Sequence, residues 1–447
     1  MHDEETRSRA VPSGRLARLG GFGRLAGGVA GGMIAEGARR LAAGERPRMG
    51  ELLLTPGNAA RVADRLSHLR GAAMKLGQMI SMDAGDVLPP ELSAILARLR
   101  NQAYRMPPAQ LDRVLRAEWG ADWRRRFRHF DASPIAAASI GQVHRATLLD
   151  GRVLAIKVQY PGVAESIDAD VDNVATLLRV SGLLPAGLDI APLLGEAKRQ
   201  LAEEADYVRE GAEMRRYGAR LAGDARYVVP ALEEALTTKA VLAMDFVEGR
   251  AVETLAEAPD EVRDRTVSAL VELVLRELFD FGVMQTDPNF ANYRWQPDTG
   301  KLVLLDFGAT RAVPAATADA YRRLIEAGLA RDLPLIRTIA VETGFVGAAA
   351  ADAHRSAIDR MIAAIDAALN RPGPFDFGDR AFVPVVREEA RALIADRETW
   401  HVPDVETLFV QRKVSGTALL AARLNAKVDV RGLAARAIVA SSPSSST

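Results

Sequence analysis

The sequence predicts an α+β protein with two lobes, a small lobe that contains β-strands and a larger lobe that is mostly helical. Three observations lead to this prediction. Apolar residues recur at helical spacing from about residue 51 to residue 128, segments with β-type alternation begin near Phe130, and the chain after Gly249 is again mainly helical. Because 48% of the 447 residues are hydrophobic, the chain can bury at least one large core.

Changes in composition divide the chain into five predicted regions. The small lobe begins where the helical stretch gives way to β-type segments, and it ends with a strand that stops at Glu248-Gly249. The regions are a Gly/Ala-rich N-terminal extension at 1–50, a helical extension at 51–130, a small lobe with inserted helices at 131–247, a helical lobe at 248–440 and a disordered, serine-rich tail at 441–447.

Each lobe contains a predicted β-hairpin. In the small lobe, residues 143–149 and 152–158 flank the turn residues Asp150 and Gly151. In the large lobe, a turn that ends at Gly300 separates two short strands. The other predicted elements are helices within 163–221, a strand at 240–247, and the two short strands at 293–295 and 301–305.

The overall composition excludes several classes of function. The 58 Lys and Arg residues balance the 58 Asp and Glu residues, so net charge gives no support for a nucleic-acid partner. The chain has no cysteine, which rules out disulfides, thiolate metal sites and a cysteine nucleophile.

The N-terminal sequence indicates a cytoplasmic protein. The opening residues 1–5 are too acidic for a transit peptide and lack the order of charged and then apolar residues found in a secretory signal. The apolar run between Arg24 and Arg39 contains Glu36 and is shorter than the roughly 20 residues that cross a bilayer. We therefore expect no membrane-spanning segment.

The same run has glycines at spacings that allow helices to approach closely, and it leaves two interpretations open. Gly27, Gly28, Gly31 and Gly32 could form an interfacial or self-associating helix, which would give peripheral contact with the inner face of the membrane or a homodimer. Alternatively the run is a flexible or core-packed tail, because each glycine weakens an isolated helix by about 1 kcal/mol.

An alanine-rich segment enters the first hairpin. Ala136-Ala137-Ala138-Ser139-Ile140-Gly141-Gln142-Val143 fits the kinase phosphate-loop template G-x-G-x-x-G-x-V, with alanine at the first two glycine positions. Small residues let backbone N–H groups approach phosphates. Taken alone this match is weak, because alanine-rich turns are common in an alanine-rich chain.

The returning strand carries a candidate phosphate-binding lysine. Ala155-Ile156-Lys157 has the order of the kinase strand whose lysine holds the α and β phosphates. A lysine on a strand is usually a solvated surface residue, but its position after this loop and across a hairpin favours a functional Lys157.

Two motifs in the large lobe give the strongest signal. Asp287 and Asn292 have the D-x-x-x-x-N spacing of a kinase catalytic loop, and Asp306-Phe307-Gly308 follows the second hairpin. Asn292 and Asp306 are predicted to hold Mg²⁺ against the phosphates of ATP, and Asp287 to orient or deprotonate the attacking hydroxyl or water. A helix cap at Asp287 and a simple turn at Asp306 are the alternatives.

Several acidic residues compete to pair with Lys157. Asp206 and Glu210 share one face of the predicted helix, whereas Glu204 lies on another side. We favour Glu210 as the partner of Lys157. Solvated helix charge is the alternative for the other acids.

The strand at 240–247 is placed where a kinase presents backbone groups to adenine. Met244, Asp245 and Val247 are the candidates, on position alone.

Together these motifs resemble the UbiB-type atypical kinases, a family that includes the mitochondrial kinase/ATPase of coenzyme Q biosynthesis. The resemblance extends from about Gly20 to Gly432. Lys75-Leu76-Gly77-Gln78 matches the K-x-G-Q signature of the family, Glu204-Ala205-Asp206 matches its E-x-D motif, and the alanine-rich loop, the lysine strand and residues 285–289, 306–311 and 374–378 match further family segments.

The resemblance implies a two-lobed, protein-kinase-like fold whose N-terminal helical extension covers the active site. It also implies that Lys75 and Gln78 lie near the nucleotide, with Lys75 facing Glu204 and Asp206. The departures are small and uncharged, since Phe290, Ala291 and Tyr293 stand where the family often has Trp, Ser and Phe.

Two absences disfavour a protein substrate. Asn289 stands where protein kinases usually carry a lysine, and no A-P-E segment follows Asp306. We expect Mg²⁺-dependent ATP hydrolysis, or phosphoryl transfer to a small or lipid-like molecule, in support of ubiquinone biosynthesis. The alternatives are a nonenzymatic nucleotide-binding pseudokinase that scaffolds quinone-making enzymes, and a small-molecule phosphotransferase of the aminoglycoside or choline kinase type.

Overall fold

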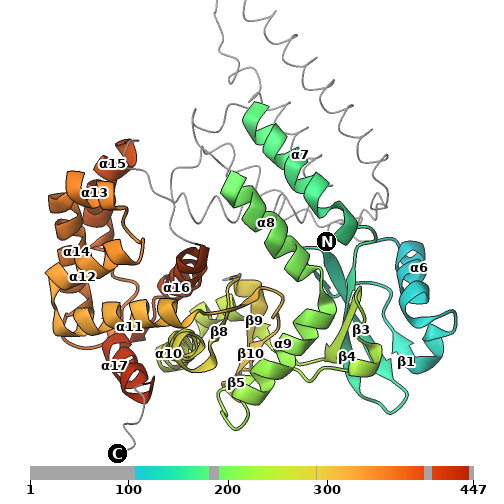
Figure 1. Ribbon diagram of the computed structural model, residues 1–447. Helices are drawn as coiled ribbons and strands as arrows, with labels where there is room; N and C mark the ends of the chain where they lie inside the picture. The colour runs from blue at the N-terminus through green and yellow to red at the C-terminus, as the bar shows by residue number, and fades with distance from the viewer. Residues whose placement is uncertain (1–105, 181–190, 288, 397–404, 442–447) are drawn as a thin grey trace, which may run out of the picture. The chain divides into compact units, whose positions relative to one another are not determined.

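The computed structural model describes residues 106–180, 191–287, 289–396 and 405–441 (Figure 1). The chain forms two compact units. The first unit contains the residues up to Arg215 together with Ala231–Phe246, and the second contains Arg216–Pro230 and the chain from Val247 onward. The mixture of helices and sheets confirms the predicted α+β class.

An antiparallel sheet of five strands forms the centre of the first unit. The strand order is β1-β3-β4-β6, and β2 pairs with the free end of β3. Gly151, in the left-handed region at φ 93°, makes the turn of the predicted β3–β4 hairpin, which is confirmed. The strands are β1 (Phe127–Phe130), β2 (Ala136–Ala137), β3 (Gly141–Leu148), β4 (Val153–Gln159) and β6 (Val241–Asp245).

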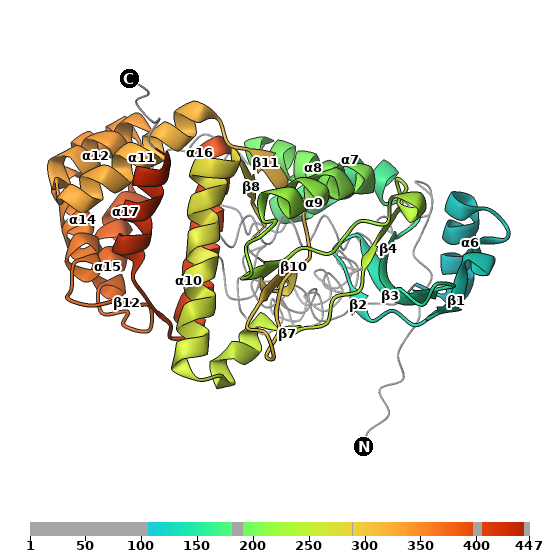
Figure 2. The same ribbon diagram turned by 90° about the horizontal axis from the view of Figure 1, so that it is seen from below.

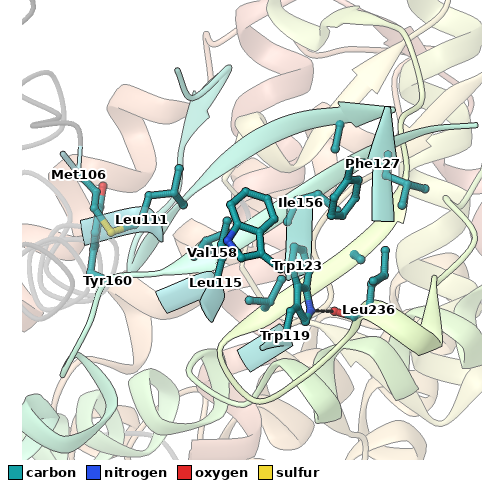
Figure 3. Packing of buried hydrophobic residues seen from close by; sticks show 14 residues of the cluster. Met106, Leu111, Leu115, Trp119, Trp123, Phe127, Ile156, Val158, Tyr160 and Leu236 are labelled. Atoms are coloured by element: carbon teal, nitrogen blue, oxygen red, sulfur yellow. Dashed lines mark hydrogen bonds between the residues drawn. The ribbon is translucent and has the colours of Figure 1, made fainter. Parts of the chain in front are cut away.

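Helix α6 (Pro108–Trp119) covers one face of this sheet (Figures 2 and 3). Proline is tolerated in the first turn because its missing N–H would have no intrahelical acceptor there. The helix ends at Gly120, and its apolar side contributes to a cluster with the alternate β4 residues that face it. The buried members of the cluster include Leu111, Leu115, Trp119, Trp123, Phe127, Leu154, Ile156 and Val158.

The predicted helical stretch ends slightly earlier than expected. A 3₁₀ turn at Trp123–Arg126 leads directly into β1, which begins at Phe127 rather than after residue 128. Phe127 is buried, and its ring centroid lies 5.4 Å from that of Trp119. Packing against the tryptophans and pairing with Leu148 therefore outweigh the helical tendency of these residues.

Helix α9 lies on the opposite face of the sheet, where Glu210 pairs with Lys157 of β4. The described residues of the predicted helical region 163–221 form three α-helices, of which α7 and α8 lie side by side (Figure 1). Ala205 and Asp206 separate α8 from α9, because Asp206 starts a new helix by accepting a hydrogen bond from the N–H of Arg209 at 3.0 Å. The helices are α7 (Ile167–Val180), α8 (Ala191–Glu204) and α9 (Tyr207–Arg220), and α9 continues into the second unit at Arg216.

The second unit contains short sheets among helices. A four-stranded sheet has the order β5-β10-β9-β7, and its β9–β10 pair is the predicted second hairpin, which is confirmed. Two further pairs are β8 with β11 and β12 with β13. The strands are β5 (Tyr227–Val228), β7 (Arg250–Ala251), β8 (Val283–Gln285), β9 (Tyr293–Trp295), β10 (Leu302–Leu304), β11 (Thr310–Ala312), β12 (Phe375–Asp376) and β13 (Lys427–Val428).

Helices make up most of the second unit, as predicted. One apolar core joins α10, β8, α11 and α16 through buried residues that include Val274, Met284, Tyr321 and Val410. The helices are α10 (Asp260–Arg276), α11 (Ala315–Ala330), α12 (Leu333–Glu342), α13 (Ala348–Ala353), α14 (Arg355–Leu369), α15 (Val383–Ala395), α16 (Val405–Arg423) and α17 (Val430–Ser441). Among the described parts of both units, no helix combines the length and the hydrophobicity needed to cross a bilayer.

Candidate active site

In the first unit, β4 places Lys157 against helix α9. The side chains of β4 alternate, so Lys157 points away from the α6 core that holds Ile156 and Val158. The Nζ atom of Lys157 lies 3.0 Å from Oε1 and 3.1 Å from Oε2 of Glu210. The Glu210 side chain is fully buried and that of Lys157 is 9% exposed. The structure thus contains the pairing that the sequence favoured, while the catalytic roles of the two residues stay predictions.

The two acids of the E-x-D motif have different surroundings. Asp206 caps α9, and this cap begins the turn that carries Glu210. Glu204, at the end of α8, is buried and accepts a hydrogen bond from the hydroxyl of Ser139 at 3.0 Å. The amide of Gln159 donates to the carbonyl of Ala205, between the two acids, at 2.7 Å. The motif is therefore fixed at its backbone by the lysine strand.

The alanine-rich segment forms a tight hairpin. Ala136 pairs with Val143, Ala137 pairs with Gln142, and the N–H of Ala138 donates to the carbonyl of Gly141 at 2.9 Å. Ser139 and Ile140 make the turn at the tip. Because Ile140 is buried, and because Ser139 is bonded to Glu204, neither side chain is available to a phosphate. Any contact of this tip with a nucleotide would involve its backbone.

Gly141 has a structural reason to be glycine. A Cβ atom at this position would lie 2.3 Å from the carbonyl oxygen of Val158 on β4. The glycine therefore permits the close approach of the two strands, which differs from the expected role of admitting a phosphate.

A buried polar network follows this glycine, and it was not predicted from the sequence. The side-chain carbonyl of Gln142 accepts from the N–H of Met106 at 2.9 Å, and its amide nitrogen lies 2.8 Å from Nε2 of His144. The other ring nitrogen of His144 lies 2.7 Å from the carbonyl oxygen of Asp131. Gln142 was predicted to contact the nucleotide, but its side chain is used in this network.

The predicted adenine-binding residues are divided between the units. Met244 and Asp245 end β6 in the first unit, whereas Val247 belongs to the second. The N–H groups of Asp245 and Phe246 donate to the carbonyls of Ala231 and Val153, both at 2.9 Å. These two N–H groups are therefore not donors for adenine.

In the second unit, two paired strands bring the catalytic loop and the Asp306-Phe307-Gly308 segment together. β8 leads into Asp287, β11 follows Gly308, and Gln285 is opposite Thr310 in this antiparallel pair. The N–H and hydroxyl of Thr286 both donate to the carbonyl of Ala309, at 3.1 and 2.8 Å. The residue before Asp287 is thereby attached to the segment that contains Asp306.

Asn292 is attached to both aspartate segments. Its side-chain amide donates to the carbonyl of Asp287 at 3.4 Å, and its own carbonyl accepts from the N–H of Leu305 at 3.0 Å. Asp306 follows immediately, and one of its carboxylate oxygens accepts from the N–H of Gly308 at 3.1 Å. The second unit therefore brings Asp287, Asn292 and Asp306 together, as the sequence predicted.

The donor set of these residues suits Mg²⁺. The carboxylate of Asp306 and the amide oxygen of Asn292 are hard oxygen ligands, and Mg²⁺ is usually held by one or two protein carboxylates together with phosphate oxygens and water. No group of three or more Asp, Glu, His or Cys side chains that could hold a metal occurs in the described parts of the chain. Such a site would thus depend on ligands that come with the nucleotide.

Asn289, which stands where a lysine is usual, has a local structural role. Its side chain accepts a hydrogen bond from the N–H of Ala291 at 3.1 Å and caps the short turn at Phe290–Asn292. Lys75, Gln78 and the segment from Gly27 to Gly32 lie outside the described residues.

A second set of residues in this unit was missed from the sequence. Glu277 and Lys413 form a buried ion pair, with 3.3 Å between Lys413 Nζ and Glu277 Oε2. A glutamate within the apolar run that ends α10 was the only sign of it, and the sequence contains no sign that Lys413 would be its partner.

Comparison with known proteins agrees with the geometry. Residues 98–340 match the ABC1 atypical kinase-like domain. The chain is 39% identical over 437 residues to the "Atypical kinase coq-8, mitochondrial" of Caenorhabditis elegans, with 95% of this chain and 57% of the relative aligned. It is 36% identical over 439 residues to the "Atypical kinase COQ8, mitochondrial" of Saccharomyces cerevisiae, with 96% and 86% aligned. The chain therefore spans less than two thirds of the length of the nematode relative.

A solved structure also resembles the chain. The complex of Rv3197 with erythromycin from Mycobacterium tuberculosis is similar with a TM-score of 0.58 and 25% sequence identity, and the match covers 84% of this chain and 94% of that one.

Proposed function

Because the chain belongs to the ABC1 atypical kinase-like family, we propose that it binds ATP with Mg²⁺ and either hydrolyses it or transfers its terminal phosphoryl group to a small or lipid-like molecule. The observation that carries this proposal is the buried ion pair of Lys157 and Glu210 on the sheet of the first unit. A lysine is rarely placed in such an interior unless its charge has a partner and a use.

Each candidate residue then has a defined task. Lys157, held by Glu210, neutralises charge on the α and β phosphates. Asp287 orients the attacking hydroxyl or water and accepts its proton. Asn292 and Asp306 would hold Mg²⁺, which when bound neutralises the charge of the phosphate oxygens.

The acceptor is the finer part of the proposal. Asn289 caps a turn and offers no charge to a phosphoryl group, which supports water or a small or lipid-like acceptor over a peptide. Since two relatives bear the names coq-8 and COQ8, we further propose that the activity supports coenzyme Q biosynthesis. We also propose a cytoplasmic location with peripheral contact at the inner face of the membrane, where quinone precursors and quinone-making enzymes would be the partners.

Hydrolysis assays test the enzymatic part of the proposal. The purified full chain, Asp306→Asn and the exposed control Asp298→Asn are compared with Mg-ATP, with and without anionic vesicles and phenolic quinone precursors. We expect turnover in the full chain and the control, stimulation by vesicles or precursors, and loss of about 10²-fold or more in Asp306→Asn. Tight nucleotide binding without turnover in the full chain would instead support a nonenzymatic scaffold.

The pathway and the membrane contact need separate experiments. A deletion strain should lose ubiquinone and accumulate an early precursor, and normal quinone levels would refute the link. Flotation with vesicles compares the full chain with a chain that begins near residue 51. Equal flotation would remove the membrane role from the segment at residues 27–32.

A further inference from the structure

Next to the catalytic loop, the second unit contains a cluster of polar side chains that are almost completely buried. Glu277 has no exposed surface, Lys413 is 2% exposed and Tyr217 is 1% exposed. Gln285 and Tyr293, which flank the loop on β8 and β9, complete the cluster. None of these residues belongs to the set that would touch the nucleotide.

Glu277 reaches the cluster through an unusual turn. Residues Glu277–Phe281 form a π-helical turn directly after α10, and Gly282 ends it with φ 63°. π-Helical turns are rare in proteins, and those that occur are often found at functional sites. One oxygen of Glu277 accepts from the hydroxyl of Tyr217 at 2.9 Å and from the backbone N–H of Gln285 at 3.3 Å, and the other faces Lys413.

Lys413 faces three polar partners in this cluster, two through hydrogen bonds and one through an ion pair. From α16 its Nζ atom lies 2.9 Å from the hydroxyl of Tyr293, 3.4 Å from the side-chain oxygen of Gln285 and 3.3 Å from Glu277 Oε2. Tyr293 follows Asn292 directly, and Gln285 precedes Asp287 by two residues. One ammonium group is therefore bonded at both ends of the catalytic loop.

The charge states are consistent with this arrangement. Burial by itself would lower the pKa of Lys413, but the Glu277 carboxylate and the Tyr293 hydroxyl outweigh it and raise that pKa, so the ammonium remains charged at neutral pH. Burial raises the pKa of Glu277, and Lys413 opposes the shift.

Stability alone does not account for a pair of this kind. Replacing a buried ion pair with well-packed apolar side chains often leaves the stability of a protein unchanged or increases it. The reason is that the cost of desolvating the two charges offsets their Coulomb attraction. What the pair adds is hydrogen bonds of fixed direction, and here they end on the two flanks of the loop.

Helix α16 also contacts the loop region at a second point. The guanidinium carbon of Arg423 lies 5.1 Å from the ring centroid of Phe290, inside the loop. One helix that is distant in sequence thus contacts the loop before Asp287, within its short turn and after Asn292.

We propose that Lys413, together with Glu277, is a positioning residue that holds the catalytic loop in the geometry in which Asp287 and Asn292 act. This inference rests on the proposed function. It adds a role for helix α16, which contributes no group that would contact the nucleotide. A loop displaced by about 1 Å can lose roughly 10²-fold in rate while its ligands still bind.

The test uses the variant Lys413→Met in the full chain. The matched control is Lys427→Met, which changes an exposed lysine of β13. We expect kcat for Mg-ATP hydrolysis to fall about 10- to 100-fold in Lys413→Met, with less than about a threefold change in KM. The control should keep wild-type kcat and KM. Unchanged kcat in folded Lys413→Met would overturn the proposal.

A second variant separates positioning from stability. Lys413→Met leaves the Glu277 carboxylate buried without its cation, and Lys413→Met/Glu277→Gln removes that charge, so the double variant should recover thermal stability. It should not recover kcat, because the bonds from the ammonium to Tyr293 and Gln285 are still missing. Recovery of kcat along with stability would show that the pair serves folding only.

Amide hydrogen exchange keeps the inference testable even if the wild-type protein hydrolyses no ATP, which would refute the proposed function alone. Lys413→Met/Glu277→Gln should then exchange faster than wild type over residues 286–293, with unchanged exchange in β3 and β4 of the first unit. Equal exchange in the loop would overturn the positioning role.

Discussion

The ammonium of Lys157 and the carboxylate of Glu210 lie 3.0 Å apart in the first unit, and both side chains are buried. Removal of one partner takes away the buried opposite charge that faces the other. Substitutions in this pair are therefore expected to affect stability and catalysis separately.

Lys157→Met should destabilise the first unit by about 3–5 kcal/mol, because it removes the buried cation that faces the Glu210 carboxylate. The double variant Lys157→Met/Glu210→Gln should recover much of this loss. Both should lose ATP hydrolysis by about 10²-fold or more, since neither has the phosphate-binding charge. Chemical denaturation and turnover assays measure the two effects.

The exposed Lys239→Met serves as the control for these variants, and it should change neither quantity. Wild-type turnover in the double variant would mean that Lys157 has no role at the phosphates.

Asn292 is predicted to affect the Mg²⁺ requirement of the enzyme. Asn292→Ala removes a predicted metal ligand and also the donor to the carbonyl of Asp287. The Mg²⁺ concentration that gives half-maximal hydrolysis should rise about 10- to 100-fold, as found when groups that orient or supply metal ligands are lost. The comparison is Gln296→Ala, which removes a half-buried amide that donates to the carbonyl of Glu248. Identical Mg²⁺ titrations for the two variants would contradict the assignment.

Gly141 gives a prediction about packing. Gly141→Ala would place a Cβ atom 2.3 Å from the carbonyl oxygen of Val158, so the β3–β4 pair must shift, with a loss of about 1–3 kcal/mol. Gly195→Ala is the matched control, because this helical glycine has open space around it and should gain about 0.5–1 kcal/mol. Thermal melts of both variants measure the difference. Equal stability changes would show that the strands do not require a glycine here.

The sequence predicted the local parts of this structure well. Both hairpins could be identified because turn residues such as Gly151 separate short strands in which apolar and polar residues alternate. This alternation can be seen in the sequence because it involves only residues that are close together in the chain. The residues brought together in the second unit were predicted because Asp287, Asn292 and Asp306 have fixed spacings around one hairpin. Glu210 was favoured for Lys157 because the helical period leaves few acids on one face.

Contacts between distant residues could not be predicted in this way. Lys413 lies more than a hundred residues from Glu277 in the sequence, and no local period relates the two. Gln142 fitted a phosphate-loop template, but that template describes only how closely the backbone can approach a phosphate. It therefore gave no information on where the side chain of Gln142 would point. The helix break at Asp206 was also missed, because a capping aspartate looks like an ordinary helix charge until its hydrogen bond is seen.

The network around His144 predicts a pH dependence of stability. The Asp131 carbonyl can only accept, so Nδ1 of the neutral ring carries the proton and Nε2 accepts from the Gln142 amide. Burial lowers the pKa of His144, so the unfolded chain takes up a proton more readily than the folded one. The stabilisation is therefore complete above the unfolded pKa of about 6.5 and is lost as pH falls from there towards the lower folded pKa.

We expect the melting temperature of the first unit to fall between about pH 7 and pH 5, the range in which histidine titrates. Protonated Nε2 would face the Gln142 amide donor, and a rotated Gln142 could no longer accept from the N–H of Met106. His144→Gln, which does not titrate, should reduce this fall. His129→Gln removes an exposed histidine of β1 and should leave the fall unchanged, because the partner of His129 is also partly exposed. If the melting curves of wild type and His144→Gln depend on pH in the same way, protonation of this ring does not limit stability.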